Sequence, residues 1–313
     1  MDELLENWMV GNVENIEPIS SYWGKTSLVN TADGRSFVLK EKSDFSRLEL
    51  EAGILMDLSK VGAPVAVPIP TVDGNRHAFD QGRIYCLYPR LPGSAISEHY
   101  AGDAIGRARA FGKAIGFLHS CFEKCRNIGS VQELNLIDQV EGWAIPCIRR
   151  KKEVFSNQAI DEIWSEYKRG LAVLEKDQPK QLIHRDLTPA NMLFQKGRLT
   201  GFVDFDMVMM GQKIFDVGYC GTSLLVSGFQ DSEKVKKWPR LFQALVCGYR
   251  ELCSLTLPEL HTLPGILVTI QLLFMAFSIE THAEDAARCN MSVLKWLSTK
   301  EAYFSLMLAA PGI

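Results

Sequence analysis

The segment Leu182-Ile183-His184-Arg185-Asp186-Leu187-Thr188-Pro189-Ala190-Asn191-Met192-Leu193 is the most informative part of this chain. It places a carboxylate at Asp186 and an amide at Asn191, and the run Asp204-Phe205-Asp206 begins thirteen residues after Asn191. Apolar, strand-like residues flank each polar group, so we expect these side chains on short loops beside strands. A carboxylate can accept the proton of a hydroxyl group, and amide and carboxylate oxygens are suited to binding Mg²⁺. The spacing therefore predicts a polar site that is hard to obtain by chance.

Length and composition limit the possible partners. The 313 residues suffice for two lobes or one large domain, and a hydrophobic content of 47% can fill a core. The formal net charge of -3 argues against a general affinity for nucleic acid or an anionic membrane. Any phosphate binding must then come from local groups, and the sequence does not indicate an oligomeric state.

The cysteine pattern and the N-terminal residues indicate where in the cell the protein is expected. Eight cysteines are scattered without a C-x-x-C pair, which indicates free thiols and a reducing cytoplasm. The acidic start, residues 1–6, lacks the layout of a secretory signal. The run Thr262–Ile279 is uncharged but includes Pro264 and Gln271, so we interpret it as a buried helix rather than a membrane span. We therefore predict a cytoplasmic protein without a membrane partner.

The first part of the chain has the pattern of a β-rich lobe. Three strand-like segments are expected at residues 16–19, 27–31 and 36–40, and Ala32-Asp33-Gly34-Arg35 is expected to join the last two as a hairpin. A helix is expected over residues 46–61, ending at Gly62. Asp73-Gly74 is interpreted as a second hairpin turn, followed by a strand over residues 83–88. Pro89, Pro92 and Gly93 then mark a lobe boundary.

Beyond Gly93 the pattern is mostly helical. Helices are expected at about residues 101–125, 135–147, 157–175, 213–228, 233–254 and 264–297. The exception is a short β insert that carries the motifs at His184 and Asp204. The sequence thus predicts an α+β, bilobal protein, with residues 1–91 as a small β-rich N-lobe and residues 92–313 as a larger α-helical C-lobe.

Lys40 ends the strand-like run Phe37-Val38-Leu39-Lys40. It could be a surface lysine at the end of a hairpin, but together with the downstream loop we favour a phosphate-binding lysine. A cationic side chain of this kind usually needs a carboxylate partner, and the following helix offers Glu49 and Glu51. Glu51 lies one turn before Leu55, where an inward-facing carboxylate would be, so we prefer Glu51 as the partner of Lys40.

The segment 20–27 imitates a phosphate-binding loop. Gly24-Lys25-Thr26-Ser27 resembles the end of a Walker A motif, but its first glycine would fall at Ile19, and the segment leads into a strand rather than a helix. The Walker interpretation therefore fails. A turn over nucleotide phosphates remains possible, with Ser21 and Gly24 contributing a hydroxyl and backbone N–H groups.

Other polar residues near the motifs have structural interpretations. His184 is expected to brace the loop, and Arg185 either contacts a phosphate or is solvated. Asp206 either binds metal or caps nearby backbone. Asp216 is a lone acid in an apolar stretch, so burying it requires hydrogen-bonded partners and favours a brace under the loop. His119 is expected to be a packed histidine near a helix end.

These segments together resemble the aminoglycoside phosphotransferase and choline kinase-like superfamily, which shares the protein-kinase fold. The resemblance covers residues 16–225 and continues more weakly beyond them. Its most specific part is the loop 184–191 with Gly201-Phe202-Val203-Asp204-Phe205-Asp206. Supporting matches are the runs 65–68, 91–93 and 112–119.

The resemblance implies roles for several residues. Asp186 would be the catalytic acid/base, Asn191 and Asp204 would hold Mg²⁺, and Lys40 would contact the phosphates of ATP. Adenine would meet the segment 87–93, whose candidate contacts are Leu87, Tyr88, Arg90 and Leu91. The sequence does not distinguish ATP from GTP.

The chain also departs from protein kinases. Its nucleotide loop is poorer in glycine than G-x-G-x-x-G, and Asp206 replaces the glycine of D-F-G. Asp216 follows Asp204 by only twelve residues, too few for an activation segment that docks peptides. The resemblance therefore implies an ATP- and Mg²⁺-dependent phosphotransferase acting on a hydroxyl of a small molecule such as an amino alcohol, a homoserine-like amino acid, a sugar or an aminoglycoside. A Ser/Thr protein kinase of the stress-response type and an inactive nucleotide-binding regulatory protein are the alternatives.

Overall fold

The computed structural model describes residues 2–19, 24–129, 131–151 and 157–300. The chain forms two compact units. The first consists of Met1–Ser94, Lys124–Val131 and Leu193–Asp206, and the second of Ala95–Glu123, Gln132–Met192 and Met207–Ile313. Each unit contains segments that are far apart in the sequence. The chain combines helices with antiparallel strands, so the fold is α+β, as the sequence predicted.

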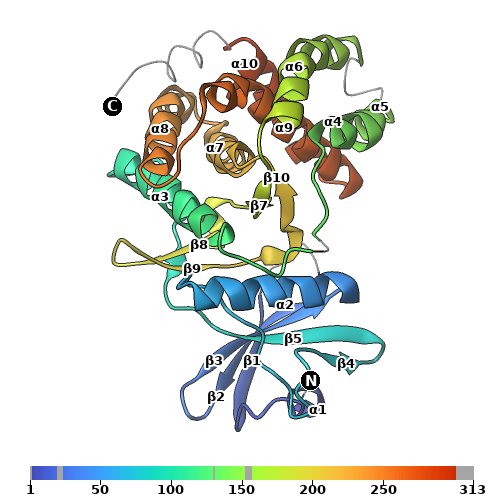
Figure 1. Cartoon of the computed structure of the whole chain (residues 1–313), viewed down its shortest axis with the longest axis vertical. Coiled ribbons are helices and arrows are strands. Elements are labelled where there is room, and N and C mark those ends of the chain that lie inside the picture. Colours follow the sequence, from blue (N-terminus) through green and yellow to red (C-terminus); the bar gives the residue numbers. More distant parts are fainter. Residues whose placement is uncertain (1, 20–23, 130, 152–156, 301–313) are drawn as a thin grey trace. The chain divides into compact units, whose positions relative to one another are not determined.

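The first unit contains an antiparallel sheet in the order β1-β2-β3-β5-β4 (Figure 1). Its strands are β1 (Val13–Ile19), β2 (Thr26–Thr31), β3 (Ser36–Lys42), β4 (Ala78–Asp80) and β5 (Arg83–Pro89). The predicted hairpin at residues 32–35 is confirmed, since β2 and β3 pair with Asn30 opposite Ser36. A short helix, α1 (Asp2–Leu5), precedes the sheet.

Strand β3 divides its side chains between the two faces of the sheet. Phe37 and Leu39 lie in a buried apolar cluster with Leu4, Leu5 and Trp8 from the N-terminal segment. Because side chains alternate along a strand, Lys40 and Lys42 share the opposite face. The strand therefore presents two lysines side by side on one face.

Helix α2 (Phe45–Lys60) follows β3. Its N-cap is Asp44, whose carboxylate accepts the backbone N–H of Ser46 at 2.9 Å. The helix buries Leu48, Glu51 and Leu55 at the spacing of a single helical face. Among these buried residues Glu51 is the charged one, so its environment must supply a partner.

A second, three-stranded sheet has the order β6-β8-β9. Its strands are β6 (Ser94–Ala95), β8 (Met192–Gln195) and β9 (Arg198–Phe202). The backbone N–H of Phe202 donates to the carbonyl of Pro64 at 2.9 Å, and Phe202 also forms a parallel bridge with Val65. These contacts fix the end of β9 two residues before Asp204.

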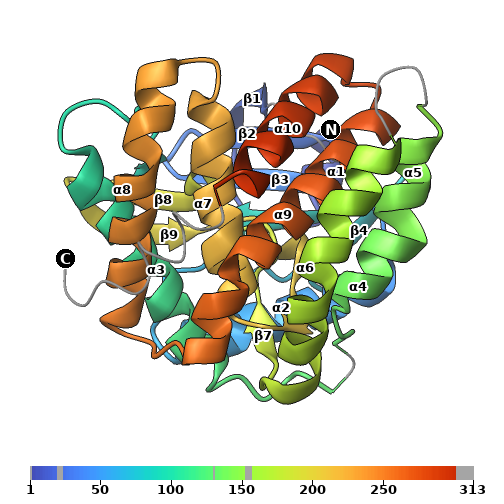
Figure 2. The ribbon, with the colours of Figure 1, turned by 90° about the horizontal axis from the view of Figure 1, so that it is seen from above.

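The second unit is mainly helical, with one short antiparallel pair, β7 (Gln181–Ile183) and β10 (Met209–Gly211). Its helices are α3 (Ala104–Phe122), α4 (Leu136–Gln139), α5 (Ile145–Arg149), α6 (Asn157–Asp177), α7 (Ile214–Gly228), α8 (Ser232–Arg250), α9 (Leu257–Glu280) and α10 (Glu284–Ser298). Helix α9 lies between α6 and α10 and also packs on α7 (Figure 2).

Helix α9 begins with a capping box formed by Thr256 and Glu259. In the described part of the chain it alone has the length and apolar composition of a membrane span, but 83% of its most apolar window is buried inside the protein. This agrees with the predicted buried helix.

Three predicted elements differ in detail. The range 135–147 contains α4, a π-helix (Val140–Ala144) and the start of α5. The range 264–297 is two helices, because the chain turns after α9 and His282 adopts a φ of 58°. Asp73-Gly74 forms a local turn and not a β-hairpin. The hairpin joining β4 to β5 uses Gln81 and Gly82, with φ values of 48° and 75°, as a type I′ turn requires.

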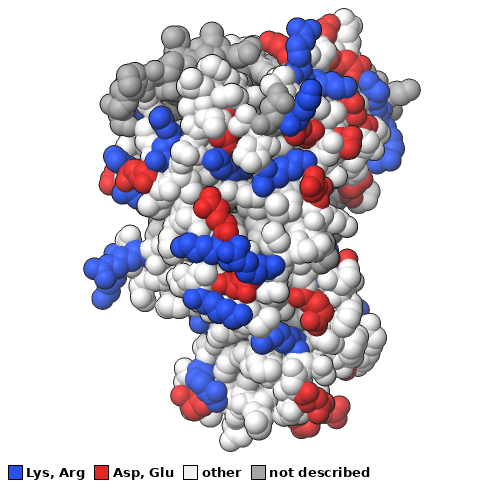
Figure 3. Space-filling view, viewed as in Figure 1, with Lys and Arg blue, Asp and Glu red and all other residues white. Residues whose placement is uncertain are grey.

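Charged side chains of both signs are interspersed on the face shown in Figure 3. Such a distribution fits the small net charge of -3. A broad basic surface, as proteins use to bind nucleic acid, does not appear on that face.

Candidate active site

Two lysines and three carboxylates form an ion-pair network in the first unit. Lys42 Nζ lies 2.6 Å from Glu51 Oε2, and Lys40 Nζ lies 2.6 Å from Asp206 Oδ2. Lys40 also pairs with Asp204, and Lys42 pairs with the second oxygen of Asp206. Asp206 therefore bridges the two lysines. The sequence interpretations of Asp206, a metal ligand or a backbone cap, did not include this pairing with two lysines.

The expected pairing of Lys40 with Glu51 is wrong. Glu51 is the inward-facing carboxylate of α2, as preferred over Glu49, but its partner is Lys42. Glu49 is 57% exposed and lies 3.8 Å from His77 Nδ1. Sequence reasoning missed Lys42, although the alternation of β3 places it on the same face as Lys40.

Burial and charge oppose each other in this network. Burial alone would lower the pKa of Lys42, but the charges of Glu51 and Asp206 outweigh it and raise that pKa. The pKa of Lys40 is likewise raised, because Asp206 and Asp204 outweigh its burial. For Glu51, burial is the larger effect and raises the pKa of its carboxyl. Both lysines are therefore held in the charged form.

Tyr88 completes the surroundings of Lys42. Its hydroxyl donates to Glu51 Oε1 at 3.2 Å, and Lys42 Nζ lies 5.5 Å from the centre of its ring. A cation over an aromatic face gains further electrostatic stabilisation. Lys42 is therefore enclosed by two carboxylates and an aromatic ring.

Asp204 combines an unusual backbone conformation with a partly exposed carboxylate. Its φ is 69°, a left-handed conformation that is uncommon for a residue other than glycine and that clusters at functional sites. Its side chain is 41% exposed and that of Asp206 31%, and the ammonium group of Lys40 lies between the two carboxylates. The pair thus already holds one cation through oxygen atoms. This donor chemistry fits Mg²⁺.

The residues predicted to contact adenine differ in their exposure to solvent. Leu87 is 0% exposed and packs in the same apolar cluster as Phe37, so its side chain cannot contact adenine and that expectation is corrected. The hydroxyl group of Tyr88 already donates a hydrogen bond to Glu51. Arg90 is exposed and Leu91 is half-buried, so both are accessible.

In the nucleotide loop, Ser21 lies outside the described residues. Gly24 has a φ of 63°, and a Cβ there would come 2.9 Å from the carbonyl oxygen of Glu41. Both the backbone and the lack of space require glycine at this position. The local backbone therefore explains the glycine at position 24, whether or not a nucleotide binds there.

The loop 184–191, which carries the expected catalytic acid/base Asp186, is in the second unit, and there Asn191 holds Asp186. Asn191 Nδ2 donates to the backbone carbonyl of Asp186 at 2.7 Å and to its Oδ2 at 3.0 Å. A short 3-10 helix, Pro189–Asn191, turns the chain back so that this contact can form. The acid and the amide that the sequence singled out are thus brought together in this loop.

Asp216 braces the backbone of this loop, as predicted. It is fully buried at the start of α7, and its two oxygens accept the backbone N–H groups of His184 at 2.7 Å and Arg185 at 2.8 Å. His119 Nε2 lies 3.0 Å from Asp216 Oδ2, and His119 Nδ1 lies 2.9 Å from the Tyr249 hydroxyl. His119 is therefore part of a buried polar network as well as packed. Sequence reasoning missed Tyr249, which comes from α8.

Arg185 is held by residues at the end of α4 and the start of β10. Its guanidinium donates to Gln139 Oε1 at 3.0 Å and to Met209 Sδ at 3.1 Å. Its φ of 67° is again left-handed. These contacts fix the backbone of the residue before Asp186, in addition to the hydrogen bond from its N–H.

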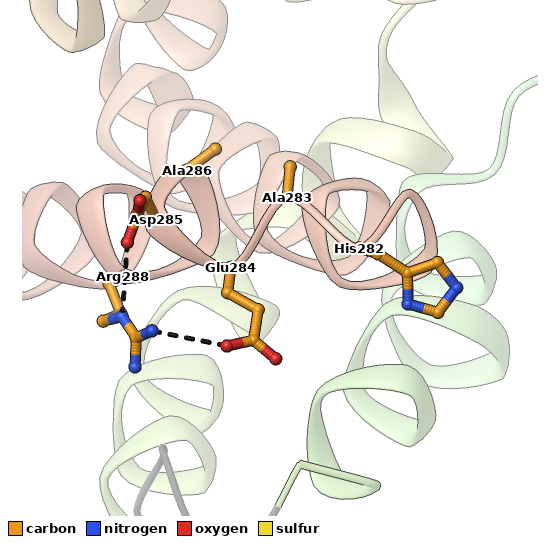
Figure 4. A pocket seen from close by; sticks show the side chains of 6 residues that line it. All are labelled: His282, Ala283, Glu284, Asp285, Ala286 and Arg288. Atoms are coloured by element: carbon orange, nitrogen blue, oxygen red, sulfur yellow. Dashed lines mark hydrogen bonds and ion pairs between the residues drawn. The ribbon is translucent and has the colours of Figure 1, made fainter.

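Glu280, His282, Glu284 and Asp285 are the acidic cluster at the end of α9 and the start of α10, which the sequence offers either as a pocket for a cationic substrate or as a solvated helix end. Arg288 lies 3.3 Å from Glu284 and 3.8 Å from Asp285. Figure 4 draws both contacts and shows that His282 points away from them. The Asp285 side chain is fully exposed and that of Glu284 58% exposed. The residues border an open hollow on the surface. The exposure favours solvation over a built pocket for a cationic ligand.

Relatives of known activity share part of this sequence. Homoserine kinase of Sinorhizobium medicae is 27% identical over 216 residues, which cover 68% of this chain and 61% of that protein. Homoserine kinase of Zymomonas mobilis is 25% identical over 256 residues, or 80% of this chain and 75% of that protein. The chain thus spans about three fifths of the first curated relatives that it matches.

Solved structures show the same fold. A microcompartment-associated aminopropanol kinase aligns with a TM-score of 0.74 and 16% identity, over 98% of both chains. The amicoumacin kinase hAmiN, solved with AMP-PNP and Ca²⁺, aligns with a TM-score of 0.72 and 16% identity, over 96% of this chain and 90% of that one. A sequence model described as "Phosphotransferase enzyme family" matches residues 15–241, which include Lys40, the catalytic loop and Asp204. The chain therefore belongs to the phosphotransferase enzyme family.

Proposed function

We propose that this protein is an ATP- and Mg²⁺-dependent phosphotransferase that acts on a hydroxyl group of a small molecule. The observation that carries the proposal is the catalytic loop, in which Asn191 holds Asp186 while Asp216 fixes the backbone before it. A carboxylate fixed in this way can orient an alcohol and accept its proton.

Each unit has its own part in the proposed reaction. In the first unit, Lys40 provides a charged donor for nucleotide phosphates, with Arg90 and Leu91 as accessible residues for adenine. Asp204 and Asp206 are the residues of this unit that we propose to hold Mg²⁺, and the sequence resemblance adds Asn191 to the proposed ligands. When bound, Mg²⁺ neutralises charge that develops on the transferred phosphoryl group. The positive charge of Lys40 acts in the same direction.

Asp186 performs the proton chemistry. The acceptor hydroxyl donates to the Asp186 carboxylate, its oxygen bonds to the γ-phosphorus, and the bond from that phosphorus to the ADP oxygen breaks. The proton of the hydroxyl passes to Asp186. Asn191 keeps the carboxylate oriented through the bond to Oδ2. Positioning of this kind accounts for much of the rate in phosphoryl transfer.

The names of similar proteins guide the choice of acceptor. Homoserine and aminopropanol are small molecules that carry a hydroxyl and an amino group, and the relatives named for them match most of this chain. We therefore propose small amino alcohols and hydroxylated amino acids as the first acceptors to examine. The reducing cytoplasm remains the proposed location.

The experiment measures ADP formation by the purified protein with Mg-ATP and a panel of hydroxyl compounds: homoserine, aminopropanol, choline, ethanolamine, hexoses and aminoglycosides. Asp186→Asn should lower turnover on the accepted compound about 10²- to 10⁴-fold, because it removes the proton acceptor. Asp285→Asn, at a fully exposed acid of the same unit, is the matched control and should leave turnover unchanged. Near wild-type turnover by Asp186→Asn would remove the assignment. Binding of Mg-ATP without consumption on any compound would favour the inactive nucleotide-binding alternative.

A further inference from the structure

Lys40 is bound on two sides by the carboxylates that we propose to hold Mg²⁺. Its Nζ donates to Asp206 Oδ2 at 2.6 Å and also donates to Asp204 Oδ1. All three residues belong to the first unit. Among the residues that the structure describes, these two carboxylates are the ion-pair partners of Lys40. The ammonium group of Lys40 is therefore the cation that Asp204 and Asp206 share.

Asp206 pairs with a lysine through each of its two oxygen atoms. Oδ2 accepts a hydrogen bond from Lys40, and Oδ1 accepts one from Lys42. A divalent cation on either oxygen would come close to an ammonium group, and like charges repel each other. A dication can therefore use Asp206 as a full ligand only when one of the two lysines moves away.

The surroundings of the two lysines decide which one moves. Lys42 Nζ also lies 2.6 Å from Glu51 Oε2 and 5.5 Å from the centre of the Tyr88 ring. Lys42 would thus keep a carboxylate partner if Asp206 turned to another cation. Lys40 would lose both of its carboxylates at once, and its side chain is also the more exposed of the two, at 15% against 7%. Lys40 is therefore the lysine that moves.

A displaced Lys40 needs another anion. An ammonium group that is partly buried is unfavourable without a counter-ion, and phosphate oxygens are suitable acceptors for it. The flexible four-carbon stem of a lysine lets the ammonium group turn from one acceptor to another. Binding of nucleotide phosphates to Lys40 and binding of a divalent cation to Asp204 and Asp206 should therefore favour each other.

We propose that Lys40 is an internal counter-cation, which competes with a divalent metal ion for Asp204 and Asp206 and is drawn away by nucleotide phosphates. The inference rests on the proposed function, because it takes these two carboxylates as metal ligands. Its consequence is a positive coupling between nucleotide and metal, and such coupling is reciprocal. Lys40 thus weakens the binding of the metal ion alone, although it strengthens the binding of phosphates.

Binding of Mn²⁺ in the absence of nucleotide tests the competition, because Mn²⁺ accepts the same oxygen ligands as Mg²⁺. Electron paramagnetic resonance of the free ion measures the bound fraction. Lys40→Met removes the ammonium group and keeps an unbranched side chain. This variant should bind Mn²⁺ about tenfold more tightly than the wild type, or more, since a neighbouring unit charge changes proton binding to a carboxylate by such factors. Lys40→Arg keeps the charge and should stay within about threefold of the wild type.

Lys60→Met is the matched control, because it removes one positive charge from the same unit. Lys60 is 73% exposed and follows Glu51 on α2 by nine residues, or about 13 Å along the helix axis. Salt screens a charge at this distance, so the affinity for Mn²⁺ should change by less than about twofold. Adding Asp204→Asn to Lys40→Met should abolish the gain, because it removes one of the two carboxylates.

Three outcomes would overturn the proposal. The first is Mn²⁺ binding by Lys40→Met that is no tighter than that of the wild type or of Lys60→Met. The second is a gain that survives the addition of Asp204→Asn, since the ion would then bind elsewhere. The third is the absence of Mn²⁺ binding in both the wild type and Lys40→Met, since the carboxylates would then not attract a dication.

A crystal structure of the wild-type protein grown with Mn²⁺ and without nucleotide needs neither a variant nor an acceptor. We expect the ammonium group of Lys40 to have left both carboxylates, while Lys42 still pairs with Glu51. Mn²⁺ bound to Asp204 and Asp206 with Lys40 still between them would overturn the proposal. A gain of Mn²⁺ affinity in Lys40→Met, together with a wild type that consumes no ATP on any acceptor, would support the competition and count against the proposed function.

Discussion

Lys42 Nζ lies 2.6 Å from Glu51 Oε2, and through Asp206 it shares a counter-ion with Lys40. The two lysines differ in how far solvent reaches them. The Lys42 side chain is 7% exposed and its partner Glu51 9%, whereas Lys40 is 15% exposed and its partner Asp204 41%. A ligand can therefore reach the Lys40 pair more readily than the Lys42 pair. We infer that Lys42 is a structural cation and that Lys40 is the lysine for phosphates.

The first prediction concerns Lys42→Met. Removing one member of a buried ion pair leaves Glu51 uncompensated, so the free energy of unfolding should fall by about 3–5 kcal/mol. Denaturant unfolding measures this free energy. Lys60→Met is the control, because the Lys60 side chain is 73% exposed. The double variant Lys42→Met/Glu51→Met should recover part of the loss. A single variant within about 1 kcal/mol of the wild type would contradict the structural role.

The second prediction concerns Lys40→Met. Because its carboxylate partners Asp204 and Asp206 are partly exposed, this variant should lose little stability, but it removes a charged donor for phosphates. Binding of Mg-ATP, measured by isothermal titration calorimetry, should weaken about tenfold or more. Lys60→Met again serves as the control. If Lys42→Met stays folded and weakens ATP binding more than Lys40→Met does, the two roles are reversed.

Local patterns predicted the parts of the fold that local interactions determine. The β2–β3 hairpin follows from period-2 alternation around Asp33-Gly34, and α2 follows from its apolar spacing up to Gly62. Helix α1 was not predicted, because four residues carry no periodic signal and its leucines are buried only by contact with the sheet. Tertiary contacts also decide that the chain breaks between α9 and α10.

The candidate site shows the same division. Asp186, Asn191 and the brace at Asp216 could be predicted, because the motif spacing and an isolated acid in an apolar run are visible in the sequence. The partner of Glu51 could not be predicted, since Lys40 and Lys42 share a face and only packing chooses between them. Tyr249 was missed for a related reason. It reaches His119 from a helix distant in the sequence, and a tyrosine in an apolar helix ordinarily indicates core packing.

The third prediction concerns Asp216→Asn. Asn keeps one oxygen but replaces the other with an N–H₂ group, which would face a backbone N–H donor of His184 or Arg185. Leaving a buried donor unsatisfied should lower the free energy of unfolding by at least about 2 kcal/mol and should also reduce turnover. Asp231→Asn is the matched control. Asp231 caps α8 by accepting the N–H of Glu233 at 2.9 Å, and Asn is an equally good N-cap. Equal stability of the two variants would show that the brace contributes nothing.

The fourth prediction links Asp57 to the pH dependence of stability. The Asp57 carboxylate accepts the backbone N–H groups of Arg126 at 2.8 Å and Asn127 at 3.0 Å, which ties the segment after α3 to helix α2 within the first unit. The hydrogen bond from Arg126 is the main cause that lowers the pKa of Asp57 below its ordinary value. Asp57→Ala should therefore cost about 1–2 kcal/mol of unfolding free energy at neutral pH.

The sign of the pH effect follows from that lowered pKa. A carboxyl whose pKa is lower in the folded state stabilises the fold above its unfolded pKa of about 4, and the contribution is lost as the pH falls through the folded value. The difference between the wild type and Asp57→Ala should thus be full at pH 7 and should shrink at pH 3 and below. Glu49→Ala, an exposed acid on the same helix, is the control and should show little difference at pH 7. A difference for Asp57→Ala that stays constant between these pH values would show that the carboxylate charge does not strengthen the contact.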